Sequence, residues 1–87
     1  MNTSISEFLA YLDQEDEVDY GDFKREVDYH LRKMVASLGH LSHEQVLQVR
    51  RMREQLLWSY QADVKEMRAK LREEVLHLES AMSIEGT

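Results

Sequence analysis

The sequence predicts an all-α protein, because it contains almost nothing that interrupts a helix. Its 87 residues include no proline and only three glycines, and residues with high helix propensity dominate the remainder. Apolar residues recur every three or four positions along three segments, which is the spacing of an amphipathic helix. We therefore predict a short N-terminal helix followed by an antiparallel helical hairpin, with two copies assembling as a dimeric four-helix-type bundle.

The first helix is expected at about residues 4–13. Ser4 and Glu7 have the spacing of a capping box, in which a hydroxyl and a carboxylate satisfy each other's free backbone amides. The apolar face of this helix comprises Ile5, Phe8, Leu9 and Leu12. A helix of about ten residues is only marginally stable alone in water, so we expect it to dock on another surface.

An acidic segment follows the first helix. Residues 1–22 hold seven acidic and no basic side chains, whereas residues 23–87 hold eleven basic and ten acidic side chains. Because like charges repel and little of the segment from Asp13 to Asp22 can be buried, we expect a loop or linker there. The chain is thus predicted to divide into an acidic arm, residues 1–22, and a helical body, residues 23–87.

The second helix is expected at about residues 23–38. Asp22 is a favourable N-cap, and Gly39 suits the left-handed position that follows a helix C-terminus. The apolar face comprises Phe23, Val27, Leu31, Met34, Val35 and Leu38. The connection to the next helix is short, so the two helices should be antiparallel neighbours.

The third helix is expected to run without interruption over about residues 43–82. Ser42 and Gln45 fit a second capping box, and nothing later breaks the apolar repeat. That repeat averages about 3.67 residues, which favours a nearly straight coiled-coil packing. Four of its positions are spaced by eleven residues: Val49, Tyr60, Leu71 and Met82. Such a helix would be roughly 60 Å long.

The distal part of this long helix is the reason for predicting a homodimer. The second helix can cover the third only as far as about Tyr60, and burying each large apolar side chain beyond that point is worth about 1.5–3 kcal/mol. A second copy would supply the missing cover. The predicted interface comprises Tyr60, Val64, Met67, Leu71, Val75, Leu78 and Met82. The alternative is a monomeric three-helix bundle in which the N-terminal helix folds back over this region.

Candidate residues for binding a partner protein lie in the acidic arm and opposite the main apolar stripe of the long helix. Trp58 lies on that opposite side, and protein interfaces are enriched in Trp and Arg; the alternative is that the N-terminal helix covers it. The arm interleaves carboxylates with aromatic side chains; the alternatives are that it binds a partner, solubilises the chain or folds back on the body. The candidates are Phe8, Tyr11, Glu15, Asp16, Glu17, Asp19, Tyr20, Leu47, Arg51 and Trp58.

Enzymatic, metal-binding and membrane functions lack the residues that they need. The absence of cysteine excludes disulfides and thiolate ligands, and neither a phosphate-binding Gly-rich loop nor a nucleophile elbow is present. The densest histidine cluster, His40 with His43 and Glu44, falls short of a structural site. No apolar run approaches the roughly 20 residues of a membrane span. We expect no catalytic site, cofactor, metal or membrane partner, and a cytoplasmic location.

One short segment resembles a known family. Residues 41–46, Leu-Ser-His-Glu-Gln-Val, lie between the shorter and the longer predicted helix and resemble the loop of the small phycobilisome-degradation proteins. Ser-x-x-Gln is also a general capping sequence. The resemblance covers six of the 87 residues, and the acidic arm and the longer final helix depart from it, so no functional residue is carried over.

Together these features predict a non-enzymatic adaptor, chaperone or regulator that binds a protein partner as a helical homodimer. The alternative is a small acidic inhibitor, for instance phage-encoded, that binds a nucleic-acid-handling protein by mimicking phosphate charge. A minor alternative is a DNA-binding regulator that uses the region from Arg50 to Arg53. We do not expect nucleic-acid binding as the main function, because this basic run is short and the net charge of the chain is −6.

Overall fold

The computed structural model describes residues 3–58 and 63–85, with side chains described for residues 3–57 and 63–80. Within these ranges the chain forms four α-helices and no strand: α1 (Thr3–Leu12), α2 (Tyr20–Leu38), α3 (His43–Trp58) and α4 (Val64–Glu85). The predicted all-α class is confirmed.

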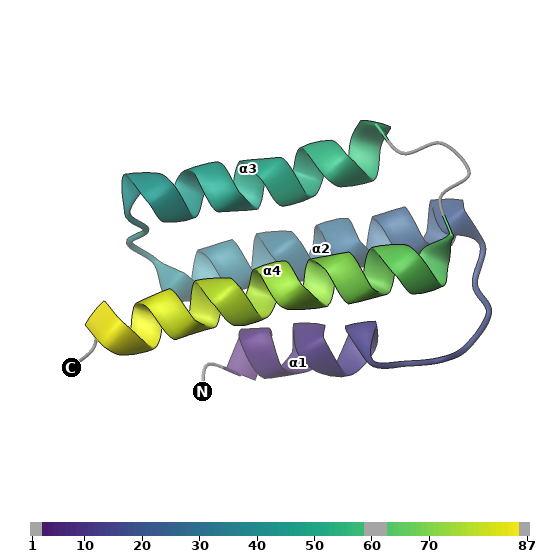
Figure 1. Cartoon of the computed structure of the whole chain (residues 1–87), viewed down its shortest axis with the longest axis horizontal. Coiled ribbons are helices and arrows are strands. Elements are labelled where there is room, and N and C mark those ends of the chain that lie inside the picture. Colours follow the sequence, from purple (N-terminus) through teal and green to yellow (C-terminus); the bar gives the residue numbers. More distant parts are fainter. Residues whose placement is uncertain (1–2, 59–62, 86–87) are drawn as a thin grey trace.

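The four helices form a closed ring in which each helix contacts the next one along the chain. α1 contacts α2, α2 contacts α3, α3 contacts α4, and α4 returns to contact α1. Successive helices run in opposite directions, as the chain can be followed in Figure 1. This is the up-down-up-down arrangement of a four-helix bundle, and here it is formed within one chain.

The prediction of one uninterrupted helix over about residues 43–82 is wrong. α3 ends at Trp58, and Asp63 lies outside helical structure just before α4. The Asp63 carboxylate accepts a hydrogen bond from the Lys65 amide at 2.9 Å, which is the role of an N-cap. An unbroken helix would be roughly 60 Å long, whereas the longest dimension of the molecule is 39 Å. The chain instead folds back and packs α4 against α3.

Two helices also begin earlier than predicted. α2 begins at Tyr20, because Asp19 rather than Asp22 is its N-cap and accepts a hydrogen bond from the Gly21 amide at 3.0 Å. α1 begins at Thr3, so the predicted cap residue lies inside its first turn. For α2, Asp19 and Asp22 are both good capping residues close to the predicted boundary, and helix propensity does not decide between them.

The connection between α2 and α3 is the one predicted. Gly39 follows α2 with a φ of 72°, a left-handed conformation that favours glycine, and its amide donates a hydrogen bond to the Val35 carbonyl at 3.3 Å. The Ser42 amide donates to Oε1 of Gln45 at 2.8 Å, and the Gln45 amide donates to the Ser42 hydroxyl at 3.2 Å. These reciprocal bonds confirm the second capping box.

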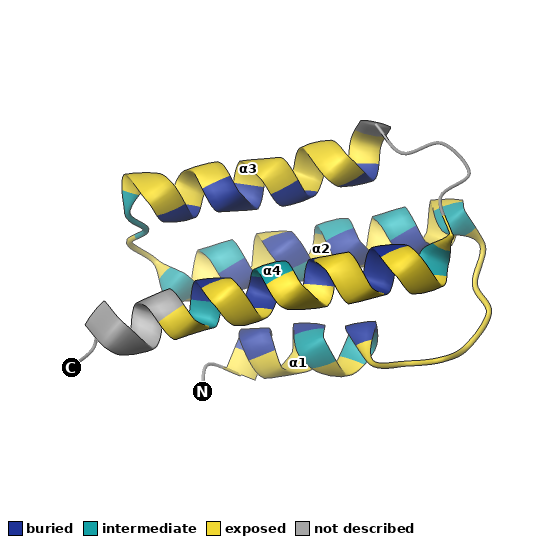
Figure 2. Cartoon of the chain, viewed as in Figure 1, coloured by how far each residue is buried: buried dark blue, intermediate teal, exposed yellow. Residues whose placement is uncertain are grey.

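One hydrophobic core takes side chains from all four helices, and Figure 2 shows the buried positions on the inward side of each helix. Its buried members are Ile5, Phe8, Leu12, Phe23, Val27, Leu31, Met34, Val49, Met52, Leu56, Met67, Leu71, Val75 and Leu78. The helix of the acidic arm therefore shares a core with the rest of the chain. α1 lies against α4, the region that the alternative to a dimer expected it to cover.

Candidate protein-binding groove between α2 and α3

α3 carries large apolar side chains that solvent reaches. Leu57 is 62% exposed, and Val46 and Leu47 are each 41% exposed. A lone exposed apolar residue is ordinary, but Val46 and Leu57 are eleven residues apart and so project from nearly the same side of the helix. That side faces the neighbourhood of α2, where both residues line one hollow.

The side of α3 that faces α4 is closed by hydrogen bonds. Gln48 is 6% exposed, and its side-chain amide donates to the carbonyl oxygen and to a carboxylate oxygen of Glu74, each at 3.0 Å. Gln45 is equally buried, and its side-chain oxygen accepts the capping hydrogen bond from the Ser42 amide. Because both of these buried polar side chains have hydrogen-bond partners, this interface between α3 and α4 needs no further partner.

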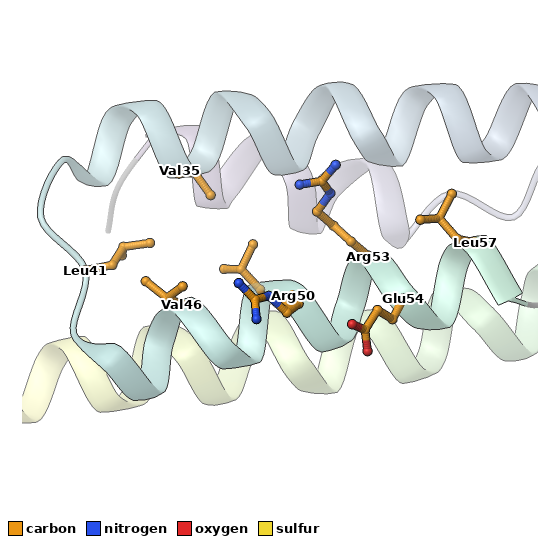
Figure 3. A pocket seen from close by; sticks show the side chains of 8 residues that line it. Val35, Leu41, Val46, Arg50, Arg53, Glu54 and Leu57 are labelled. Carbon is orange, nitrogen blue, oxygen red and sulfur yellow. The ribbon is translucent and has the colours of Figure 1, made fainter.

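The side of α3 that faces α2 is hollow, as Figure 3 shows. A cavity of about 350 Å³ opens there; its apolar lining is Val35, Leu41, Val46, Val49 and Leu57, and its charged lining is Arg50, Arg53 and Glu54. A second hollow of about 210 Å³ shares Arg53 and Leu57 with the first and adds Lys24, Arg25, Asp28 and Leu56. We call the two hollows together the α2/α3 groove.

Both ends of the α2/α3 groove are fixed by the fold. At one end the Tyr20 hydroxyl, at the start of α2, donates a hydrogen bond to the Leu56 carbonyl near the end of α3, at 3.3 Å. At the other end Leu41, in the short capped connection between the helices, lines the hollow. The groove is therefore held open between two helices whose ends are tied, which is the kind of preformed concavity that ligands use.

Positive charge dominates the rim of the groove. Arg50 and Arg53 form no ion pair with any residue that the structure describes. Of the two carboxylates at the rim, Asp28 is already paired with Arg32 at 2.9 Å, which leaves Glu54. An unpaired guanidinium beside an apolar surface offers a planar fork of donors to a carboxylate or phosphate.

The predicted partner-binding residues fall into different environments. Phe8 is fully buried, because the apolar face of α1 docks on α2 and α4, and we therefore exclude it from the contact surface. Tyr11 and Tyr20 are half-buried against the core. The exposed candidates are Glu15, Asp16, Glu17, Asp19, Leu47 and Arg51. The side chain of Trp58 lies outside the described residues.

None of the residues that line the α2/α3 groove was among the predicted partner-binding residues. The four that form one stripe along α3 are Val46, Arg50, Arg53 and Leu57. Their spacing of four, three and four residues is a helical stripe, and this is the signal that could have found them. It was hidden because the neighbouring core stripe has the same period.

The predicted dimer interface is largely occupied by the chain's own core. Its described members on α4 are Val64, Met67, Leu71, Val75 and Leu78, of which the first is half-buried and the others are buried. Tyr60 and the side chain of Met82 lie outside the described residues. Because α1 and α3 both pack against α4, an uncovered apolar stripe is no longer a reason to expect a dimer. The homodimer itself stays a prediction.

A third hollow, separate from the two that form the α2/α3 groove, lies between the acidic segment and the first half of α4. Its volume is about 790 Å³, and the Asp13 carboxylate accepts a hydrogen bond from Nε of Arg72 at 2.6 Å beside it. Arg68, which is 7% exposed, also lines it, with its guanidinium 5.9 Å from the ring centre of Phe23. Carboxylates and cations mix in this lining, so it favours no one ligand charge.

The four histidines have different environments: His30 packs against aromatic rings, whereas His40, His43 and His77 are exposed. Among the described residues, no three His, Asp or Glu side chains converge on a metal-sized site. His30 packs between Phe8 and Tyr11, with ring centres 5.5 and 5.1 Å away, and burial lowers its pKa. A search of the described helices also finds none that is both long enough and apolar enough to cross a membrane.

Comparison with known proteins does not assign this chain to a family. No protein-family model matches the sequence, and no curated protein or solved structure matches it. The functional argument therefore depends on the geometry and chemistry of the α2/α3 groove.

Proposed function

We propose that this protein binds another protein through the α2/α3 groove and serves as a non-enzymatic adaptor, chaperone or regulator. The observation that carries the proposal is Leu57, which is 62% exposed and lines a hollow with four other apolar side chains and with Arg53, which has no ion pair among the described residues. Covering such a side chain removes apolar surface from water, at about 25 cal/mol per Å². Protein interfaces commonly combine an apolar centre with a polar rim in which arginine is enriched.

The composition of the groove supports binding rather than catalysis. Its lining contains no serine, threonine, cysteine or histidine. Of the two carboxylates in the lining, Asp28 is paired with Arg32, and Glu54 has no ion pair with a described residue. A catalytic site needs a nucleophile with a base, or an acid and a base that reach the same substrate atom. The groove offers apolar surface and fixed positive charge instead.

Within this proposal, a homodimer would use another surface than the α4 interface that the sequence predicts. The α4 stripe is engaged in the core, so for a homodimer we expect the second copy to cover the exposed apolar lining of the α2/α3 groove instead. A second copy is then one kind of partner, and a different protein is the other. Light scattering of the purified chain at several concentrations distinguishes them, because only self-association makes the mass depend on concentration.

The proposal is tested by placing a charge at the centre of the groove. Leu57→Glu should abolish capture of the natural partner from host lysate, because a carboxylate would then have to be buried without compensation. Leu76→Glu is the matched control: Leu76 is on α4, is 37% exposed and lies outside the groove. The captured partner is measured by quantitative mass spectrometry for wild type and both variants.

Capture that survives Leu57→Glu, or that is lost equally with Leu76→Glu, would refute the groove as the binding surface. Circular dichroism of each variant ensures that loss of capture is not loss of folding. Leu57→Glu is suited to this purpose because the side chain is already mostly in water.

The acidic inhibitor remains as a second candidate because of one observation. The carboxylates of Glu15, Asp16, Glu17 and Asp19 are all exposed in the segment between α1 and α2. A partner held by these charges would dissociate steeply as salt is added, and neutralising them would abolish capture while Leu57→Glu would not. For the minor DNA-binding candidate, a gel shift at low salt that depends on the exposed Arg50, Arg51 and Arg53 would be required.

A further inference from the structure

We infer that the occupant of the α2/α3 groove is an amphipathic helix of a partner protein, with carboxylates beside its apolar stripe. The inference rests on the proposed function and specifies the chemistry of the partner. It follows from the shape of the groove, from the order of residues along it and from the charge on its rim.

The shape of the groove favours a helix over an extended peptide. It lies between two adjacent antiparallel helices and has an apolar floor that includes Val35, Val49 and Leu56. An extended segment laid there would leave its own backbone amides and carbonyls facing apolar side chains, and unpaired buried backbone groups are costly. A helix satisfies its backbone internally and presents only side chains, which is the helix-in-groove mode of recognition.

The order of residues along α3 sets the register of that helix. Val46 and Leu57 mark the two ends of the exposed stripe and are eleven residues, or about 16 Å, apart along the helix axis. Arg50 and Arg53 lie between them on the same side. A complementary helix of about three to four turns therefore carries apolar residues along its length and acidic residues near its middle.

The charge on the rim selects acidic over basic partners. Arg50 and Arg53 have no ion pair within the described part of the chain. On the facing rim Arg25 is already paired with Asp22, which leaves Lys24. Carboxylates placed beside these groups gain charge-assisted hydrogen bonds, whereas a basic helix would meet like charges on both sides. Opposed charges of this kind mainly set specificity and association rate.

The apolar content of the groove argues against nucleic acid as the occupant. Leu57 is the most exposed of the large apolar side chains that the structure describes, and it lies beside Arg53. A phosphate backbone would contact the arginine and leave the leucine in water. An acidic amphipathic helix contacts both.

The experiment uses three labelled peptides and the full-length protein, with binding followed by fluorescence anisotropy. The first peptide is a helix of about four turns with leucines at i, i+4, i+7 and i+11 and glutamates flanking them. The second has lysine in place of every glutamate, and the third is a shuffled sequence of the first with no stripe. We expect the first to bind about tenfold or more tighter than either of the others.

Charge reversal in the protein then tests the rim directly. The double variant Arg50→Glu with Arg53→Glu should reverse the preference, so that the lysine peptide binds more tightly than the glutamate peptide. The matched control, Lys65→Glu with Lys70→Glu, makes the same change of net charge at exposed positions of α4 outside the groove. It should leave the preference as in the wild type, which separates a local contact from the overall charge of the molecule.

Several outcomes would overturn the inference. Equal binding of the acidic and shuffled peptides would show that binding does not depend on a helical apolar stripe. Tighter binding of the lysine peptide by wild type would show that the groove prefers basic partners. Tighter binding of a duplex oligonucleotide, competing with the acidic peptide, would identify nucleic acid as the occupant. If the acidic peptide fails while Leu57→Glu still abolishes capture of the natural partner, the proposed function stands and this specification of the partner falls.

Discussion

Arg68 places a positive charge inside the bundle. It is 7% exposed, and its Nε and Nη2 have no hydrogen-bond partner among the described residues. Removing a cation from water costs several kcal/mol when no counter-charge is supplied. The ring of Phe23, 5.9 Å from the guanidinium, offsets part of this cost through a cation–π interaction of about 0.5–2 kcal/mol.

We therefore predict that Arg68→Met does not destabilise the protein. Methionine keeps the length and flexibility of the side chain and removes the charge, so the free energy of unfolding should stay the same or rise by roughly 1–4 kcal/mol. Urea denaturation followed by circular dichroism measures this change. Arg72→Met is the control, since its surface ion pair with Asp13 is worth about 0–1 kcal/mol. A loss of more than about 1 kcal/mol for Arg68→Met would mean that the guanidinium contributes a stabilising interaction.

His30 joins α1 to α2 in a way that depends on its protonation. Its ring stacks on Phe8 and Tyr11, and its Nδ1 is buried with no partner among the described residues. Burial lowers the pKa of His30 below its ordinary value of 6.5, and Lys33 acts in the same direction. Nearby carboxylates oppose this, but the effect of burial is larger.

The pKa of His30 predicts the direction of a pH effect. Below about pH 6.5 the unfolded chain binds a proton at this site more readily than the folded chain, so the free energy of unfolding falls as the pH falls. Equilibrium unfolding should show this loss of stability between about pH 7.5 and 5.5. His30→Phe keeps a ring in the stack but cannot titrate.

Glu7, one of the carboxylates that oppose the shift, titrates at lower pH than His30. The pKa of Glu7 is lowered from 4.5 by its hydrogen bond and charge interaction with Lys33, so its contribution is lost only at lower pH. Stability of the His30→Phe variant that falls as steeply as that of wild type in the His30 range would contradict the assignment.

At the scale of single elements, α1 is a structural helix. It is ten residues long and would be marginal alone, but it buries Ile5, Phe8 and Leu12 against α2 and α4. The ion pair between Glu7 of α1 and Lys33 of α2 is exposed on both sides and adds specificity of placement rather than much stability. Docking of the apolar face is therefore what keeps α1 in place.

We predict that Phe8→Ala lowers the free energy of unfolding by about 3–5 kcal/mol, because it removes a fully buried ring and leaves a cavity. That is a large part of the total for a small domain, so much of the protein would unfold at modest urea concentration. Leu57→Ala is the control and should cost much less, since that side chain is mostly in water. A cost below about 1 kcal/mol for Phe8→Ala would mean that α1 is dispensable.

The two sides of α3 differ. The side that faces α4 is packed and hydrogen-bonded, whereas the side that faces α2 borders a hollow that solvent reaches. Toward α4 its polar side chains are hydrogen-bonded, as Gln48 is to Glu74. Toward α2 it presents Val46 and Leu57 with unpaired arginines between them. Apolar side chains throughout this side of α3 would have packed against α2 and stabilised the fold. The charged side chains found there favour a role in binding a partner instead.

At the scale of the whole molecule, closure of the ring determines which surfaces remain free. α1 reaches back to α4 and completes the bundle within one chain, so the α4 stripe needs no second copy. The same closure leaves the seam between α2 and α3 hollow, with an apolar lining and excess positive charge. The acidic segment lies on a different side, against the start of α4. The molecule thus presents excess positive charge along the α2/α3 groove and exposed carboxylates in the segment between α1 and α2.

The amino-acid sequence alone is sufficient for the helical class, for the inward face of each helix and for the capped connection after Gly39. These are local properties: they depend on the spacing of apolar residues and on side chains that reach backbone groups within a turn. Leu71, Val75 and Leu78 were correctly assigned to a buried stripe for this reason. The open side of α3 was not identified, because exposure depends on what the rest of the chain fails to cover.

The reversal between α3 and α4 was settled by tertiary packing. The spacing of eleven residues keeps Val49 and Leu71 on one apolar stripe whether the helix continues or folds back, so periodicity could not tell a long helix with a partner from two helices in one chain. Folding back buries α4 within the chain itself, and this avoids the entropic cost of bringing two molecules together. The periodicity predicts that the apolar stripe is buried. Whether the same chain or a second molecule buries it depends on the path of the chain.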